Sequence, residues 1–488
     1  MAAMNNLSLN TLLSLPQSVQ IPPYDIENTG SGIVHLGPGA FHRGHQAVYT
    51  DLAMKYGGNW RITAVSMRSS VLKEKLMSQD NLYSLMVLDN EPYIKVVGAL
   101  KSILVLDEDR DEVMQALVSP DTYIATITVT EKGYCLNPDG TLNLEHKDIV
   151  HDLSNFNSPI SVIGLLVKAL LIRFQEKQNL FTVISCDNLP NNGDKLKAAV
   201  LKFAEQISDQ LVDWISHSIQ FPNTMVDSIT PATDESVIEQ CQQQLGVKDA
   251  WPVQREGFSQ WVIENKFSGP CPAWDRVGVT ITNNVEAFEK AKLRILNGTH
   301  STLAYLGGLV GIETVYEAIS RPSIEAFIRK LLEEEIIPSI GKAPEVDLTY
   351  YAYLIINRFH NKHIRHLLSQ IACDGSQKIP VRILNPIREN IQANRPNRLL
   401  CTTVATWILY LYQSFKNDIH VIDPMEDTLK SIYQRSSSPK TFAQLLVGET
   451  EIFVGLFHQS QFVKPLFEQL DKLGQIDDKW VTQCLVEL

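Results

Sequence analysis

Short apolar runs alternate with helical periods through the first half of the chain. Buried strands are predicted from these runs at 33–37, 61–67, 122–130 and 180–187. Helices are predicted from the spacing of apolar positions at 42–56, 109–117 and 160–177. Two extended runs within 81–100 flank Asp89, Asn90 and Glu91 and predict a hairpin. Strands that alternate with helices predict a mostly parallel sheet with helices on both faces.

The pattern becomes almost entirely helical from residue 286 onward. Helices are predicted at 285–309, 323–337, 348–359, 361–372, 378–393 and 398–415. Pro338 is expected to end the second of these helices and Asp347 to cap the third. We therefore expect two domains, an α/β domain at 1–285 and a mainly α-helical domain at 286–488.

The composition fits a large globular protein with an acidic surface. The chain has 488 residues, of which 44% are hydrophobic and 20% charged, so it is long enough for two domains. The formal net charge is −12. Because an acidic protein does not attract polyanions, we expect neither nucleic acid nor an anionic membrane surface as a partner.

The cysteines and the apolar stretches indicate a cytoplasmic protein. The chain has seven cysteines without a C-x-x-C pair, and apolar runs precede Cys135, Cys186 and Cys373, which predicts reduced thiols rather than disulfides. The first basic residue is Arg43, so the N-terminal stretch lacks the charged start of a secretion signal. The longest apolar stretch, 402–412, is shorter than the roughly 18 residues that suggest a membrane span.

The stretch IVHLGPGAFHRGHQA (33–47) has the strand, turn and helix order of a phosphate-binding turn. Gly37 would permit the tight turn, and Gly39 would let a pyrophosphate approach the backbone at the start of the helix. His42 stands where such turns usually carry a third glycine. From these residues alone, a dinucleotide site and an ordinary turn between a strand and a helix both remain open.

Other polar residues follow predicted strands, where the carboxyl ends of a parallel sheet bind ligands. The second strand is followed by Arg68 and by no nearby carboxylate to bind a ribose hydroxyl, which leaves NADP open beside NAD. Glu131 follows the strand at 122–130. Asp187 and Asn188 follow the next, with Asp194 expected to cap the helix after them. Asn188 is equally compatible with a turn residue that binds nothing.

The helix predicted at 285–309 carries several polar residues on one face. At about 100° per residue, Glu289, Lys292 and His300 fall within about 80°, and Asn297 lies about 60° beyond His300. Charged residues at this spacing usually mark a face exposed to solvent. This helix is otherwise apolar, however, so its polar groups need partners, and substrate hydroxyls are one possibility.

Two further groups complete the polar residues of the second half. Lys378 follows the tight turn DGSQ near the start of a predicted helix and, by itself, indicates no function. His360, His363 and His366 are spaced by three residues, but an interval of six leaves a common helix face and no set of carboxylates or cysteines accompanies them. We therefore predict no metal site.

Seven segments of the chain resemble one family, the polyol-specific long-chain dehydrogenases, or mannitol dehydrogenase family. The similarity covers nearly the whole chain and is carried by IVHLGPGAFHRGHQA, TVTEKGY, SCDNLPNNG, FPNTMVDSITP, FSQWVIENKF, KLRILNGTHSTLAYLG and DGSQKIP. The glycine turn of this family normally lacks the third glycine, so the resemblance implies a dinucleotide site here. It also implies a Rossmann-like domain that binds NAD at 1–285 and a substrate and catalytic domain at 286–488.

The resemblance also implies roles for individual residues. Lys292 matches the general base, and Asn188 and Asn297 match the residues that hold the developing alkoxide. His300 matches the histidine that orients the substrate. Glu289 matches a carboxylate associated with proton exit. Contacts with the cofactor are implied at Ile33, Gly37, Gly39, Ala40, Phe41, His42, Arg43, Gly44, Arg68, Glu131 and Asp227.

A few positions bear on the choice of substrate and cofactor. Lys378 matches a lysine that contacts the substrate. Gln370 replaces an arginine that mannitol 2-dehydrogenases often carry, as it does in fructuronate reductases. Ser70 and Val71 replace an acidic pair that helps some members reject NADP, and Ser228 replaces a usual arginine.

Three functions remain open on the sequence. The first is NAD(H)-dependent interconversion of a secondary alcohol of a linear polyol and the matching ketose, of the D-mannitol and D-fructose type, without a metal. The second is the same reaction on a hexuronate, D-mannonate and D-fructuronate, for which Lys378, Arg365 and Arg382 are candidate cations. The third is a nucleotide-binding protein without catalysis. A monomer and a homodimer are equally compatible with the sequence.

Overall fold

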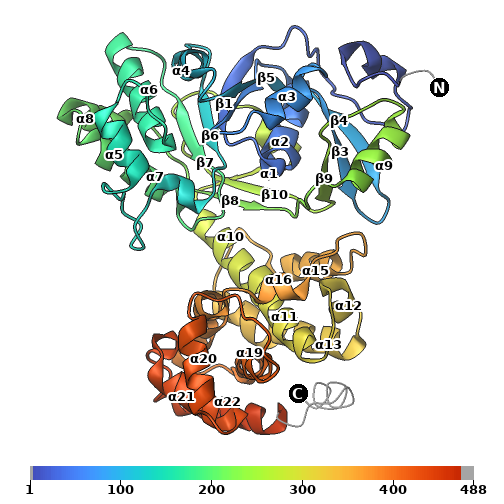
Figure 1. Ribbon diagram of the computed structural model, residues 1–488, viewed down its shortest axis with the longest axis vertical. Coiled ribbons are helices and arrows are strands. Elements are labelled where there is room, and N and C mark those ends of the chain that lie inside the picture. The colour runs from blue at the N-terminus through green and yellow to red at the C-terminus, as the bar shows by residue number, and fades with distance from the viewer. Residues whose placement is uncertain (1–3, 474–488) are drawn as a thin grey trace. The chain divides into compact units, whose positions relative to one another are not determined.

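The computed structural model describes residues 4–473, which form two compact units divided after Val285 (Figure 1). Among the described residues, no helix is long and apolar enough to cross a membrane.

A five-stranded sheet organises the first unit. Its strands are β1 (Ser31–Leu36), β2 (Arg61–Ser66), β5 (Leu100–Val105), β6 (Ile124–Ile127) and β7 (Thr182–Ser185). They are all parallel, in the order β5-β2-β1-β6-β7, which confirms the predicted sheet. The order reverses direction between β1 and β6. In sheets of this kind, ligands bind in the crevice outside the carboxyl ends of the strands at such a reversal.

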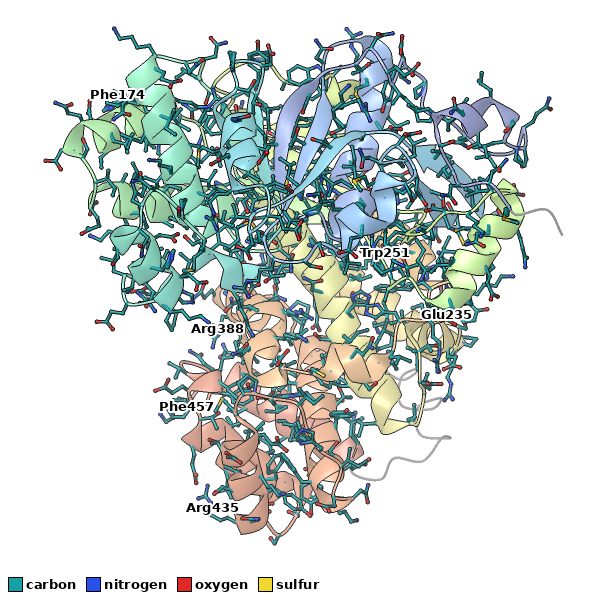
Figure 2. The ribbon with its side chains drawn as sticks, turned by 45° about the horizontal axis from the view of Figure 1, so that its top comes forward. Phe174, Glu235, Trp251, Arg388, Arg435 and Phe457 are labelled. Atoms are coloured by element: carbon teal, nitrogen blue, oxygen red, sulfur yellow. The ribbon has the colours of Figure 1, made fainter. Side chains whose placement is uncertain are left out.

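Helices cover both faces of this sheet. They are α1 (Ala40–Gly44), α2 (Gln46–Ala53), α3 (Val71–Met77), α4 (Arg110–Val118), α5 (Lys147–Ser154), α6 (Val162–Glu176), α7 (Asn192–Ala204) and α8 (Asp209–Ser218). The last helix of this unit, α9 (Glu235–Leu245), packs instead in a separate apolar core with Met86 and Ile94. One apolar core joins the sheet to α4–α8, and a second core joins its other face to α2 and α3. At the edge of the first core, Phe174 on α6 packs against Trp214 on α8, with ring centroids 5.5 Å apart (Figure 2).

Two small sheets complete the first unit. One contains β3 (Tyr83–Leu88), β4 (Tyr93–Val97) and β9 (Val253–Glu256), and its antiparallel pair β3–β4 is the predicted hairpin. The other contains β8 (Thr224–Asp227), β10 (Gln260–Glu264) and β11 (Thr280–Thr282). The sequence did not predict these last strands, because each has only three to five residues.

The second unit is helical throughout its described part, as predicted. Its longer helices are α10 (Val285–Ala291), α11 (Thr299–Leu309), α13 (Pro322–Leu331), α15 (Leu348–Phe359), α18 (Asn385–Gln392), α19 (Arg398–Lys416), α20 (Glu426–Arg435), α21 (Pro439–Glu449) and α22 (Ser460–Leu473). Short helices are α12 (Val315–Ile319), α14 (Ile337–Ile340), α16 (Leu368–Ala372) and α17 (Gly375–Ile379). Asp347 caps α15 by accepting a hydrogen bond from Tyr350 N, as predicted.

Three segments of the second unit are π-helical and continue the helices on either side. They are η5 (Lys292–Gly298), η6 (Leu332–Ile336) and η7 (Pro380–Leu384). Pro338 follows η6, and Pro380 begins η7, so a widened turn accommodates a proline in both cases. Segment η5 has no proline in or beside it. Isolated π turns without such a cause occur frequently at functional sites.

Three sequence predictions were wrong in detail. Pro338 does not end its helix, because the π turn before it lets the chain continue as α14. The helix predicted at 361–372 is only α16, because Leu367 bridges Thr314 and the carbonyl oxygen of His366 accepts from Val315 N. Asp194 lies in the first turn of α7 rather than at its cap, which is Asn191.

Candidate functional site

The turn after β1 lies at the reversal of strand order and has the geometry of a phosphate cradle. Gly37 has a φ of +91°, and a Cβ placed there would lie 2.2 Å from the carbonyl oxygen of Thr128, at the end of β6. Only glycine fits this position. Gly39 is exposed, and a Cβ there would meet nothing closer than the oxygen of Gly37 at 4.0 Å. The space before Gly39 therefore remains open to a ligand.

The first turn of α1 faces this open space. Its first hydrogen bond runs from Arg43 N to Gly39 O at 3.1 Å, so the backbone N–H groups of Ala40, Phe41 and His42 precede the helical ladder. Such N–H groups favour an anion. These residues fit the pyrophosphate of a dinucleotide through their backbone.

His42, which replaces the third glycine, points into the interior. Its ring stacks on His35 of β1, with centroids 3.4 Å apart, and its side chain is fully buried. The two ring nitrogens of His35 lie 2.7 Å from Thr126 Oγ1 and 2.9 Å from Thr128 Oγ1. Burial holds the pKa of His42 well below its usual value. His42 thus occupies the position of the third glycine, and its imidazole packs on that of His35 between β1 and α1.

Several predicted cofactor residues have buried side chains that support the glycine turn from the protein interior. Ile33 belongs to the core, and Arg43 donates to the carbonyl oxygen of Trp251 at 2.8 Å. A Cβ on Gly44 would lie 2.9 Å from Thr230. The side chains of Ile33, His42 and Arg43 are 3% exposed or less and support the turn, so the predicted contact of these residues with the cofactor would involve their backbone.

Asp187 connects two loops at the carboxyl edge of the sheet. Its carboxylate accepts hydrogen bonds from Val129 N at 3.1 Å, Thr130 N at 2.9 Å and the hydroxyl of Tyr134 at 2.6 Å. Burial raises the pKa of Asp187. These hydrogen bonds hold the loop that follows β6, which ends at Ile127. They also position the two predicted residues near Asp187, Glu131 and Asn188, both of which are exposed.

The remaining predicted cofactor residues lie on different elements. Arg68, after β2, is 82% exposed and lies 3.7 Å from Asp148 of α5. Asp227 ends β8, which belongs to a different sheet from β1, and its side chain is buried.

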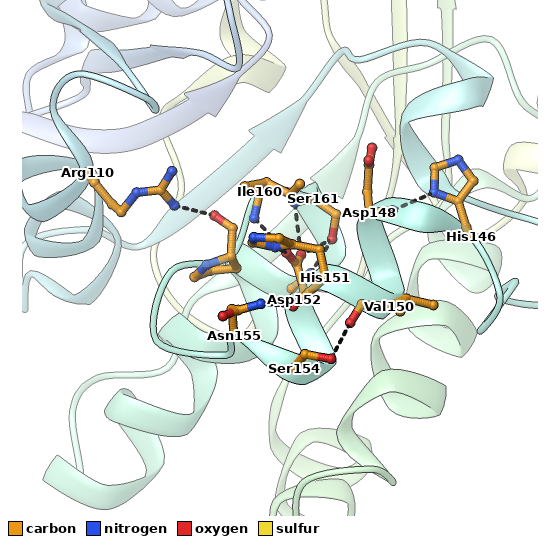
Figure 3. Close-up of polar contacts among 12 residues, drawn as sticks. Arg110, His146, Asp148, Val150, His151, Asp152, Ser154, Asn155, Ile160 and Ser161 are labelled. Atoms are coloured by element: carbon orange, nitrogen blue, oxygen red, sulfur yellow. Dashed lines mark hydrogen bonds and ion pairs between the residues drawn. The ribbon is translucent and has the colours of Figure 1, made fainter.

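The region of α5 also brings three possible metal ligands together. Cys135, His146 and Asp148 each offer a ligand atom, and these atoms lie within 4.8 Å of one another. His146 Nδ1 instead accepts a hydrogen bond from Asp148 N (Figure 3). The guanidinium of Arg68 beside Asp148 repels a cation, so the charges there disfavour a metal.

The polar residues of the second unit lie on the continuous helix α10–η5–α11. Lys292 and Asn297 belong to the π segment, and both are half-buried. The helical wheel used for the sequence prediction assumed about 100° per residue throughout. That rotation does not hold over residues 292–298, because this segment is π-helical. A π turn is wider, which brings positions five apart, such as these two, closer to one face. Glu289 precedes the segment on α10 and is half-buried.

An ion pair anchors this helix away from the predicted site residues. Arg294 is 5% exposed and donates to Ser339 O at 2.7 Å and to Glu389 at 2.9 Å. Lys290 lies 3.4 Å from the same carboxylate. Glu389 therefore pairs with two cations of the helix.

His300 is a buried, neutral imidazole. It is 8% exposed and packs against the rings of Phe359 at 4.7 Å and His366 at 5.0 Å. Burial, followed by the charges of His366, Arg358 and Arg382, holds its pKa well below the usual value. Within residues 4–473, its Nε2 has no hydrogen-bond partner. Such a nitrogen can bind a substrate hydroxyl.

The histidines considered for a metal separate in the structure. His366 packs on His300, His360 lies 3.4 Å from Glu325, and His363 is exposed.

Lys378 belongs to α17, which packs beside η5 through the next segment, η7. Its Nζ donates to Cys373 O at 2.6 Å and lies 3.7 Å from Asp374. Burial and the neighbouring Arg382 lower the pKa of Lys378. Gln370 is exposed on α16. The structure thus brings Lys378 and Arg382 near the π segment, whereas Asn188 and the glycine turn belong to the other unit.

Sequence reasoning missed two structural partners in these sites. His35 supports His42, and its signal was a histidine inside an otherwise apolar strand. Arg382 was only one of three candidate cations, and its signal was a second cation four residues after Lys378.

A parallel sheet with a glycine turn at its strand reversal defines the first unit as a Rossmann-type dinucleotide fold. Two family models match the chain: the mannitol dehydrogenase Rossmann domain over residues 31–276 and the mannitol dehydrogenase C-terminal domain over residues 284–474. The chain belongs to the mannitol dehydrogenase family, as the resemblance implied.

Relatives whose names give different activities match this chain at similar levels of identity. D-mannonate oxidoreductase of Escherichia coli (strain K12) is 40% identical over 91% of this chain and 93% of its own length. Mannitol 2-dehydrogenase of Phaeosphaeria nodorum is 37% identical over 87% of this chain and 77% of its own length. Among solved structures, Pseudomonas fluorescens mannitol 2-dehydrogenase in complex with NAD and D-mannitol matches with a TM-score of 0.80 at 34% identity and covers 99% of both chains. A substrate-free D-sorbitol dehydrogenase matches with a TM-score of 0.90 at 30% identity, over 98% of this chain and 99% of the other.

Proposed function

We propose that the chain is an NAD(H)-dependent oxidoreductase that interconverts a secondary alcohol of a linear polyol and the matching ketose, without a metal. The pair D-mannitol and D-fructose is the reference for this reaction. One observation carries the proposal: Lys292, Asn297 and His300 follow one another on a continuous helix whose π turn has no proline to cause it. The related enzyme from Pseudomonas fluorescens was solved with NAD and D-mannitol, which supports the same pair of ligands here.

In this proposal the two units have different roles, cofactor binding in the first and substrate binding and catalysis in the second. The unit up to Val285 holds the dinucleotide, with its pyrophosphate at Gly39 and the first turn of α1, because that space is open and faces backbone N–H groups. When bound, NAD supplies the acceptor for the hydride of the alcohol. The unit from Glu286 onward supplies the substrate and catalytic residues.

Lys292 is the general base in this mechanism. An alcohol becomes a ketone by losing its hydroxyl proton and the hydride of the same carbon. A neutral amine can accept that proton. We infer that Lys292 Nζ takes the proton and that Glu289, one turn earlier on α10, passes it toward solvent.

The amides and the imidazole hold the substrate. The developing alkoxide needs hydrogen-bond donors that are already oriented, and the side-chain amides of Asn297 and Asn188 fill this role in our proposal. His300 offers a buried Nε2 without a protein partner to orient a hydroxyl. Each donor of this kind contributes about 3 kcal/mol to the stability of the transition state.

The same reaction on D-mannonate and D-fructuronate is the second candidate. The two substrate pairs share the reacting carbinol and differ at the far end of the chain, where the acid carries a carboxylate. The relative from Escherichia coli bears the name of such an oxidoreductase. Arg382, a cation without a carboxylate partner among residues 4–473, favours this candidate.

A substrate panel tests the proposed function. Purified protein is assayed with D-mannitol, D-fructose, D-mannonate and D-fructuronate, each with NAD(H) and NADP(H), because Arg68 is exposed after β2 where a 2′-phosphate would lie. We expect turnover of at least one pair without added metal and in the presence of a chelator. Absence of turnover throughout the panel would instead support a nucleotide-binding protein without catalysis.

The cysteines bear on the compartment of this enzyme. Six cysteines are described, and all six are unpaired. We infer a reducing compartment, the cytoplasm.

A further inference from the structure

Arg382 is a partly buried cation beside the proposed alcohol site. It lies in η7, and its Nη1 donates to Ser301 Oγ at 3.1 Å and to the carbonyl oxygen of Asn297 at 3.4 Å. Both acceptors belong to the helix that carries Lys292 and His300. In the part of the chain that the structure describes, neither Nε nor Nη2 of Arg382 has a hydrogen bond to protein. Nη1 of the guanidinium therefore bonds to the helix, whereas Nε and Nη2 can donate to a ligand.

No carboxylate between residues 4 and 473 forms an ion pair with Arg382. Burial lowers the pKa of this guanidinium, and only the hydroxyl of Tyr305, not a carboxylate, acts against the effect. Arg294, on the helix that Arg382 contacts, shows the usual arrangement, because Glu389 neutralises it. A buried cation without a counter-ion is costly and is seldom kept without a role.

A second cation increases the positive charge at this place. Lys378 precedes Arg382 by four residues, and burial together with the charge of Arg382 lowers the pKa of Lys378. Asp374 lies 3.7 Å from Lys378 and offsets part of this charge. One net positive charge remains, and an anion from outside the protein would neutralise it.

The other candidate cation does not share these features. Arg365 is 70% exposed and lies 2.5 Å from Glu313. It is therefore already paired and solvated, which leaves Arg382 as the cation that lacks a partner.

We propose that Arg382 binds the terminal carboxylate of the substrate, so that the preferred substrates are a six-carbon aldonate and its keto-uronate rather than an uncharged polyol and ketose. This inference rests on the proposed NAD(H)-dependent oxidoreductase chemistry, and it decides between the two candidate substrate pairs of the proposed function in favour of the second. The reacting oxygen lies at the side chain of Asn297 in that proposal, and the backbone oxygen of the same residue contacts Arg382. A six-carbon chain is long enough to join the two points. Lys378 adds charge and contacts the hydroxyls between them.

The guanidinium suits this ligand chemically. Its remaining N–H groups form a planar fork that matches the two oxygens of a carboxylate. A primary alcohol at the same place would leave the charge uncompensated. Hydrogen bonds to charged groups contribute about 1.5–3 kcal/mol, which corresponds to a factor of about 10 to 150 in kcat/KM.

The test compares two ketone substrates that differ only in this charge. Reduction of D-fructuronate and of D-fructose is measured with NADH for the wild type, Arg382→Met and Arg382→Lys. We expect the wild type to prefer D-fructuronate. Arg382→Met should lower kcat/KM for D-fructuronate about 10- to 150-fold, mainly through KM, and change kcat/KM for D-fructose less than about 3-fold. Arg382→Lys should recover part of the loss because it keeps the charge.

Arg435→Met is the matched control. It makes the same change of side chain in the same unit, but Arg435 is 50% exposed and pairs with Glu449 at the surface (Figure 2). Its selectivity should equal that of the wild type. NADH binding, followed by fluorescence, confirms that each variant is folded.

The outcomes separate this inference from the proposed function. A wild type that prefers D-fructose, or an Arg382→Met variant that loses both activities equally while binding NADH, overturns the carboxylate role. If Arg382→Met does not fold, the ratio of the two substrates in Arg382→Gln, which keeps a polar side chain but removes the charge, decides, and an unchanged ratio overturns the role. A wild type that reduces neither substrate refutes the proposed function itself.

Discussion

His42 stacks on His35 with ring planes 8° apart and centroids 3.4 Å apart, directly behind the glycine turn. Both imidazoles are fully buried, and burial lowers the pKa of His35 to about 3. Two neutral histidines therefore occupy the space where a third glycine would let the helix approach the strand. This pair makes the fold of the first unit sensitive to acid.

The first prediction concerns His42→Phe and acid stability. In the folded protein the pKa of His35 is about 3, against an ordinary value of 6.5, and the pKa of His42 is also well below 6.5. Between about pH 3 and pH 6.5 the unfolded chain therefore binds more protons than the folded protein. The contribution of the two histidines to the free energy of unfolding is therefore full above about pH 6.5. As the pH falls below that value, each imidazole lowers the free energy of unfolding by about 1.4 kcal/mol per pH unit. His42→Phe should keep the stacking and reduce this slope, as measured by urea unfolding between pH 4 and 8.

Stability at neutral pH should change little in His42→Phe. Both ring nitrogens of His42 lack hydrogen-bond partners within the described chain, so removing them relieves a desolvation cost. His217→Phe is the control, because that side chain is 77% exposed. An unchanged slope in His42→Phe would contradict the buried neutral pair.

The second prediction is a matched pair of substitutions in the glycine turn. Gly37→Ala should destabilise the protein by about 2 kcal/mol or more, because φ is +91° and the new Cβ would meet Thr128 O at 2.2 Å. Gly39→Ala should leave the melting temperature nearly unchanged, since its Cβ meets no atom closer than 4.0 Å. It should instead weaken NADH binding at least tenfold, because the methyl group occupies the open space. Thermal unfolding and NADH titration distinguish the two effects, and normal NADH affinity in Gly39→Ala would place the pyrophosphate elsewhere.

The third prediction tests the proposed base. Lys292→Ala should lower turnover by a factor of about 10² to 10⁴, the range typical of a lost general base, with NADH affinity close to that of the wild type. Lys290→Ala is the control, because Lys290 points to Glu389 at 3.4 Å and takes no part in the proposed chemistry. Near-normal turnover in Lys292→Ala would refute the assignment of the base.

The fourth prediction concerns Glu335, a buried residue of η6 whose carboxylate accepts hydrogen bonds from the start of α19. Its carboxylate accepts hydrogen bonds from Leu399 N at 2.8 Å and Leu400 N at 2.7 Å, and burial raises its pKa to about 7. The folded state therefore binds more protons than the unfolded state from about pH 4.5 to about pH 7. Stability from this group is present at low pH and falls as the pH rises through that window.

Glu335→Gln should remove this contribution. Its unfolding free energy should fall less than that of the wild type between pH 5 and 7, because the amide stays neutral and its oxygen still accepts one of the two N–H groups. Glu333→Gln, an exposed neighbour on the same turn, should show the slope of the wild type. Equal slopes for Glu335→Gln and the wild type would show that Glu335 is already ionised at pH 5.

The sequence by itself determined the local structure and the family. The runs at 33–37 and 61–67 predicted β1 and β2, because buried parallel strands need continuous apolar residues. The cap at Asp347 and the hairpin at 81–100 also followed from neighbouring residues alone. The seven family segments identified the mannitol dehydrogenase family, which the family models confirm.

Tertiary structure decided what depends on residues far apart in the chain. The π turn at Lys292–Gly298 gives no local signal, and it changed the helical wheel on which the polar face was predicted. His42 needed His35 from β1 to explain its burial, and the strand reversal beside the turn exists only because β6 pairs with β1. The isolation of Arg382 depends on the carboxylates of residues 286–473 lying elsewhere. Periodicity and capping act over a few residues, whereas a missing counter-ion, a stacking partner and a strand neighbour are set by packing between distant segments.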